Sequence, residues 1–180
     1  MLEHGERLVA TLRKPEALDD LRARYLEDQL LIVKLDVTDP AQIKDAFRQA
    51  TDAFGRVDVV FNNAGSNILA EAEGTTDEAA RSLFEANFWG TANVSKEAVR
   101  VFREVNKPVG GRILNSGSHN GTVAMPTVSY YSASKFGEQF LCSSRWWRID
   151  ACAALEGFSA SLAQELDPAW NIKVSISSCP

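Results

Sequence analysis

The sequence predicts an α/β fold built on an open parallel sheet with helices wound on both of its sides. Short β-branched runs alternate along the chain with longer segments of helical periodicity. The runs are apolar on both faces, as expected for parallel strands that helices cover. No internal repeat or low-complexity linker interrupts this alternation, so residues 1–180 are predicted to form a single domain.

The order of elements follows from the hydrophobic runs and from helix-capping residues. Asp39 precedes Pro40, which is a favoured cap followed by a favoured first-turn residue, and Thr76 or Thr75 with Glu78 resembles a capping box. The predicted strands are 7–13, 30–37, 57–65, 112–118 and 172–177. The predicted helices are 15–25, 40–54, 76–105 and a segment that begins near residue 128.

Composition excludes several classes of protein. The chain is 45% hydrophobic and carries a net charge of −5, which argues against a nucleic-acid partner or an anionic membrane surface. No apolar run approaches the roughly 20 residues that cross a bilayer, and the first residues lack the apolar core of a signal peptide, so a cytoplasmic protein is expected. The three cysteines, Cys142, Cys152 and Cys179, have no spacing typical of a disulfide framework or a metal site.

A tyrosine and a lysine four residues apart are the main candidates for chemistry. Tyr131 and Lys135 in YSASK would share one helix face, where an ammonium group favours the phenolate and suits the tyrosine to acid/base work. Ser118, at the end of a predicted strand, offers a hydroxyl to a substrate oxygen at the sheet edge where α/β folds bind ligands. The pattern YxxxK alone is short and common by chance, so it indicates catalysis only when other motifs accompany it.

Three further motifs accompany this pattern along the chain. Asp36 lies in LDVT, Asn87 lies in the long predicted helix, and Asn62-Asn63-Ala64-Gly65 directly follows a strand. With these motifs the chain, from about Arg7 to Ile176, resembles the classical short-chain dehydrogenase/reductase family. The resemblance implies a Rossmann-like, doubly wound sheet and an oxidoreductase that transfers hydride between a nicotinamide cofactor and a carbonyl/alcohol substrate.

The resemblance also implies the catalytic roles. Tyr131 would give or take the proton, and Ser118 would orient the reacting oxygen. Lys135 would hold the nicotinamide ribose and assist Tyr131, and Asn87 would anchor a proton-relay water. Asn87 also has a plainer interpretation, as a helix residue that bonds to the backbone near it. The family forms dimers or tetramers through the long helix and the tyrosine helix, so a homo-oligomer is expected.

Cofactor-binding residues are implied along the same sheet edge. Asp36 would contact the adenine, and Val37 belongs to the same segment. The stretch Asn63, Ala64 and Gly65 would line the cofactor cleft, although Asn62 and Asn63 could also form only a strand-end turn. Arg13 follows the first strand where an acidic residue would receive the ribose of NAD, so NADP is favoured over NAD. The plainer interpretation of Arg13 and Lys14 is solvated surface charge.

The chain departs from the family at three places. It contains no TGxxxGxG turn, and the strand that precedes this turn would lie between the strands at 7–13 and 57–65. The sequence also stops before the family's last strand and substrate-binding segment, so we expect an incomplete NAD(P)-binding domain. Residues 137–153 resemble an insertion, because joining Phe136 to Ala154 restores one amphipathic helix. Our hypothesis is a translated intron, and the alternative is a genuine surface loop.

The sequence therefore predicts an NADP-dependent oxidoreductase acting on a small carbonyl or alcohol, with no metal. The competing hypothesis is a catalytically inactive Rossmann-like fragment, either the product of a defective gene model or a non-catalytic interaction module. The absent glycine-rich turn distinguishes the two, because without it we expect weak or undetectable cofactor binding.

Overall fold

Five parallel strands form two separate sheets in the computed structural model, which describes residues 2–118, 125–135 and 154–177. Strand β1 (Leu8–Leu12) pairs with β2 (Leu30–Lys34) in the first sheet. The second sheet has the order β3-β4-β5, with β3 (Val59–Asn62), β4 (Gly111–Ser116) and β5 (Ile172–Ser177). The α/β class with parallel strands is therefore confirmed.

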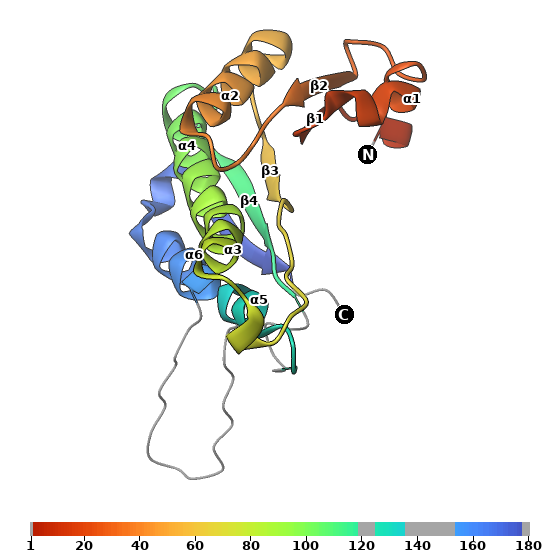
Figure 1. Ribbon diagram of the computed structural model, residues 1–180. Coiled ribbons are helices and arrows are strands. Elements are labelled where there is room, and N and C mark those ends of the chain that lie inside the picture. Colours follow the sequence, from red (N-terminus) through yellow and green to blue (C-terminus); the bar gives the residue numbers. More distant parts are fainter. Residues whose placement is uncertain (1, 119–124, 136–153, 178–180) are drawn as a thin grey trace.

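The break between the sheets falls where the sequence predicted a strand to be lacking. Within the described residues, no strand pairs with β1 on one side or with β3 on the other, so these two strands belong to different sheets (Figure 1). The predicted insertion at 137–153 lies outside the described residues.

Most helices begin and end at the residues that local chemistry predicts. Helix α2 (Pro40–Phe54) is capped by Asp39, whose carboxylate accepts from the backbone N–H groups of Ala41 and Gln42. It ends at Gly55, which adopts the left-handed conformation at φ 80°. The helix predicted at 15–25 is wrong in its extent: only a 3₁₀ turn at Pro15–Leu18 and one helical turn, α1 (Asp19–Arg22), form there. Neither segment has a buried residue, so tertiary packing does not extend the helix.

The long helix predicted at 76–105 exists but is not uniformly α-helical. Thr76 caps α3 (Asp77–Phe84), and α4 (Thr91–Glu104) continues in the same direction (Figure 1). Between them, Glu85–Gly90 form the π-helical segment η4, with Asn87 as its third residue. Such wider turns are rare and often occur at functional sites.

The hydrophobic core lies between the strands and three helices. Helix α4 contributes Val101 and Phe102, at 1% and 0% exposure, and β4 contributes Ile113 at 0%. Helix α2 packs against both α4 and β2, and α6 (Ala154–Glu165) packs against β5. The core therefore links the two sheets through the helices, because no strand joins them.

Only one face of the three-stranded sheet is covered by the described helices. Helices α2, α4 and α6 lie on the same side of it (Figure 1), and α4 contacts both β3 and β4. On the opposite face, Val59 and Phe61 of β3 are 48% and 57% exposed, and Leu114 of β4 is 37% exposed. Apolar side chains thus point from this sheet in both directions, as the sequence predicts, but the described residues bury only one set.

A hydrogen-bonded chain of polar side chains crosses the covered face near the carboxyl ends of the strands. The Asn62 amide donates to Ser95 Oγ at 3.1 Å and to Asn115 Oδ1 at 2.8 Å. The Asn115 amide in turn donates to Ser159 Oγ at 2.7 Å. All four residues are buried, so these bonds fix β3, β4, α4 and α6 in one arrangement.

Candidate functional site

The predicted catalytic residues meet beyond the carboxyl end of β4. This strand ends at Ser116, and Ser118 follows two residues later. Helix α5 (Ser129–Lys135) presents Tyr131 and Lys135 one turn apart on one face. The Tyr131 hydroxyl donates to Ser118 Oγ at 3.2 Å. The two hydroxyls therefore lie close enough to contact one substrate oxygen together.

Lys135 is buried beside these hydroxyls. The residue is only 6% exposed, and its Nζ donates to the carbonyl oxygen of Ser116 at 3.0 Å. Burial lowers the pKa of Lys135 below its ordinary value, because the ammonium form loses solvation. Lys135 thus lies one turn from Tyr131 on α5, with its Nζ bound to the backbone two residues before Ser118.

Replacing this lysine tests whether its buried charge costs stability. A folded-state pKa below the unfolded value means that the cost is largest at low pH and falls as pH rises through the folded pKa. We expect Lys135→Met to unfold at higher urea concentration than the wild type at pH 7, with a smaller difference at a pH above the unfolded-state lysine pKa of about 10.4. Urea unfolding at both pH values measures this, and an equal difference at the two pH values would contradict it.

Asn87 is fully buried, and both of its amide hydrogens have partners. Nδ2 donates to the Ser66 carbonyl at 2.9 Å and to Ser134 Oγ at 3.0 Å, and Oδ1 accepts from the Ser66 N–H at 2.8 Å. The side chain thus binds the backbone of the loop after β3 and the helix that carries Tyr131. Its amide supports the site by holding these two segments together.

The segment after β3 lies against the same cluster. Asn63, Ala64 and Gly65 are exposed, so a ligand can reach them. A Cβ atom on Gly65 would lie 3.1 Å from Asn87 Oδ1 and 3.8 Å from Lys135 Nζ, which leaves little room for a side chain. The structure therefore brings Gly65, Asn87, Ser118, Tyr131 and Lys135 together at one sheet edge.

The remaining predicted cofactor residues form a second group, at the ends of β1 and β2. The backbone N–H and the hydroxyl of Thr38 donate to Asp36 Oδ1 at 3.0 and 2.8 Å. These bonds, with a smaller contribution from the Arg13 cation, hold the pKa of Asp36 below its usual value. Val37 packs against Gly90, where a Cβ would lie 2.6 Å from Val37 Cγ2. This contact joins the second group to the end of η4.

Sequence reasoning missed two residues of the site. Ser66 presents its backbone to Asn87, and Ser134 presents its hydroxyl. No sequence pattern indicates the contact between the Ser66 backbone and Asn87. Ser134 lies inside YSASK, next to Lys135, and this position was a signal that could have identified it.

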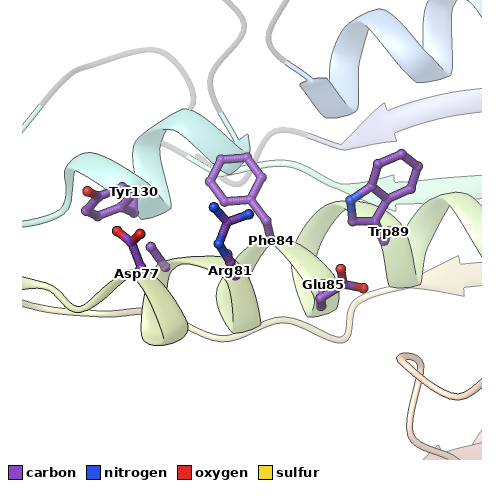
Figure 2. Close-up of a pocket in the computed structure, with 7 residues that line it drawn as sticks. Asp77, Arg81, Phe84, Glu85, Trp89 and Tyr130 are labelled. Carbon is purple, nitrogen blue, oxygen red and sulfur yellow. The ribbon is translucent and has the colours of Figure 1, made fainter.

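A separate pocket lies on the outer side of α3 and η4. Its volume is about 380 Å³, and Figure 2 shows Tyr130 of α5 opposite the side chains of the long helix. Neither Ser118 nor Tyr131 lines it. The lining residues are Asp77, Ala80, Arg81, Phe84, Glu85, Trp89 and Tyr130.

Of the helices described, none has the length and apolar character needed to cross a bilayer. Residues 2–118, 125–135 and 154–177 also contain no group of three or more His, Cys, Asp or Glu side chains that could hold a metal ion.

Parallel strands with a serine, a tyrosine and a lysine gathered at their carboxyl ends define an α/β protein with its candidate site where open sheets of this kind bind ligands. Comparison with known proteins makes this specific. The family model described as short chain dehydrogenase matches residues 1–145. The chain belongs to the short-chain dehydrogenase/reductase family.

Individual relatives agree with this assignment. The chain is 37% identical over 175 residues to an uncharacterised oxidoreductase of Schizosaccharomyces pombe, covering 97% of this chain and 52% of the relative. A short-chain dehydrogenase structure from Streptomyces avermitilis matches with a TM-score of 0.78 and 34% identity, over 97% of this chain and 56% of that one. A family member from Burkholderia phymatum, solved in complex with NAD, matches with a TM-score of 0.74 and 25% identity, over 96% and 56%. The chain spans about half the length of the curated relatives it matches.

Proposed function

We propose that the chain carries the catalytic centre of an NADP(H)-dependent oxidoreductase that interconverts a small carbonyl compound and its alcohol. The observation that carries the proposal is the 3.2 Å hydrogen bond between Tyr131 and Ser118. The buried Lys135 beside it adds the cation that this chemistry requires. We treat residues 1–180 as one incomplete NAD(P)-binding domain.

In the direction of reduction, a nicotinamide cofactor held at this site would supply the hydride for the carbonyl carbon. Ser118 donates a hydrogen bond to the carbonyl oxygen, and Tyr131 transfers its hydroxyl proton to that oxygen as negative charge develops. Lys135 stabilises the tyrosinate left behind. Asn87 keeps the loop after β3 against α5 through its bonds to Ser66 and Ser134.

The residues present fit the nicotinamide ribose and the adenine of the cofactor better than its pyrophosphate. Tyr131 and Lys135 would hold the nicotinamide ribose, and Asn63, Ala64 and Gly65 would line the cleft beside it. Asp36 and Val37 would face the adenine, and Arg13 would bind the 2′-phosphate, which is the reason for preferring NADP. The pyrophosphate would need a glycine-rich turn, which the 180 residues do not contain.

Calorimetry with NADPH and NADH tests the proposal. We would compare this chain with a variant that lacks residues 137–153 and carries the first strand and glycine-rich turn of a related enzyme. The proposal expects the second protein to bind NADPH more tightly than NADH and to reduce a reactive diketone. If it bound neither cofactor, the second candidate, a non-catalytic interaction module, would be favoured, for which the unpaired edges of β1 and β3 provide the supporting observation.

A second copy of the chain is the partner that we propose for the pocket in Figure 2. Trp89 is 51% exposed there, beside Phe84 and Tyr130, so association would remove apolar surface from water. Members of this family are often oligomeric, which supports this choice, and light scattering of the purified chain tests it. For location we propose the cytoplasm, on the acidic composition of the chain.

A further inference from the structure

Ser134 is a buried hydroxyl between two parts of the site. The residue precedes Lys135 directly and is 0% exposed. Its Oγ donates to the backbone carbonyl of Tyr131 at 2.8 Å and accepts from Asn87 Nδ2 at 3.0 Å. One hydroxyl therefore connects α5, which carries Tyr131 and Lys135, to the π-helical segment that carries Asn87.

The connection continues beyond Asn87. The amide of Asn87 binds both the N–H and the carbonyl of Ser66, as a neighbouring strand would. Turning this amide over would place like groups against one another at Ser66 and leave Ser134 without its donor, so the three bonds fix a single orientation. The loop after β3, η4 and α5 are thus joined through two buried side chains.

The distances in this region leave little tolerance. A Cβ at Gly65 would lie 3.1 Å from Asn87 Oδ1 and 3.8 Å from Lys135 Nζ, so the backbone of the loop lies almost in contact with both. A shift of α5 away from Asn87 would therefore change the gap between the cofactor-side loop and Lys135. Misplacement of reacting groups by about 1 Å can cost about 100-fold in rate.

We propose that Ser134 is a positioning residue, which sets the distance between the loop at 63–66 and the face of α5 that carries Tyr131 and Lys135. The proposal rests on the proposed function, because that face is the one assigned to catalysis. Ser134 itself contacts no reacting atom. It acts through Asn87 on one side and through the Tyr131 backbone on the other.

The same helix offers a matched control. Ser132 is 7% exposed, and its hydroxyl has no hydrogen-bond partner in the structure as described. Ser132→Ala and Ser134→Ala remove the same atom from buried positions two residues apart. Only Ser134→Ala deprives Asn87 of a partner, so a difference between the variants reports on that bond.

Hydrogen exchange by NMR on the 180-residue chain tests the positioning without any cofactor. In Ser134→Ala, we expect exchange of the Asn87 side-chain amide and of the Ser66 N–H to become roughly tenfold faster, as for loss of one buried hydrogen bond. Exchange of core amides such as that of Ile113 should change much less. The proposal is overturned if all these amides change equally, or if Ser132→Ala has the same local effect.

An activity measurement then separates this inference from the proposed function. It uses the variant that lacks residues 137–153 and carries the first strand and glycine-rich turn of a related enzyme. Ser134→Ala should lower kcat about tenfold and raise KM for NADPH, because the two segments that it positions are both assigned to the cofactor, and Ser132→Ala should leave kcat and KM near wild type. If the unsubstituted variant has no reductase activity, the proposed function fails while the exchange result still decides the positioning. If the unsubstituted variant is active and Ser134→Ala has the same kcat, the positioning inference fails while the proposed function stands.

Discussion

We expect Gly111→Ala to lower the free energy of unfolding by about 3 kcal/mol, at the upper end of the range for overpacked cores. Gly111 begins β4, where it is buried against the ring of Phe102. An added Cβ would lie 2.5 Å from two ring atoms of this side chain, and Phe102 is itself 0% exposed. The ring cannot move outward, so the strand or α4 must shift. Urea unfolding followed by circular dichroism measures the loss.

Two further variants test whether the contact with Phe102 is the cause. Gly74→Ala is the matched control, because a Cβ there meets nothing within 4 Å, and its stability should stay within about 0.5 kcal/mol of wild type. Phe102→Leu should recover part of the loss when combined with Gly111→Ala, since neighbouring substitutions are not additive. Equal stability of Gly111→Ala and wild type would show that the strand can accommodate a Cβ at position 111 and would contradict this prediction.

We expect Tyr131→Phe to lower the reductase activity of the variant that lacks residues 137–153 and carries the first strand and glycine-rich turn, by a factor of about 100 to 10,000. The substitution removes only the hydroxyl that donates to Ser118. The ring is half-buried and remains, so the fold should be kept, and cofactor affinity should fall only by the loss of one hydrogen bond to the ribose. Initial rates of NADPH oxidation with a reactive diketone measure the effect, and calorimetry verifies that NADPH still binds.

Tyr130 provides the control for this prediction. It is the adjacent residue of α5, but it lines the outer pocket with Phe84 and Trp89. Tyr130→Phe should therefore retain nearly full activity. Comparable losses in the two variants would mean that a general disturbance of α5, and not the loss of the proton donor, explains the result.

Hydrophobic periodicity was sufficient to predict the strands. The run Ile172–Ser177 forms β5 without adjustment of its boundaries, and the predicted cap at Asp39 begins α2. The two-sheet arrangement also follows from sequence, since the strand expected between β1 and β3 has no candidate run. Such features depend on local composition and on the order of elements, which a sequence displays directly.

The features that sequence could not predict depend on contacts between distant segments. The π turn at Asn87 leaves no mark in residue periodicity, and it is accompanied by the close approach of Gly90 to Val37. The bond between Asn87 and Ser134 joins residues 47 positions apart. The segment 15–25 has helical composition, but it lacks a buried face and forms only short turns. In each case tertiary packing decides the outcome.

The unpaired edge of β3 has a consequence for how the chain behaves at high concentration. An edge strand presents backbone N–H and C=O groups that can pair with another polypeptide, and natural proteins usually protect such edges with charge, proline or a covering segment. Here Val59 and Phe61 add exposed apolar side chains to that edge, so hydrogen bonding and desolvation favour the same intermolecular contact. We therefore expect β3 (Val59–Asn62) to contribute to association at high concentration, and Phe61→Lys would be the simplest means of reducing it.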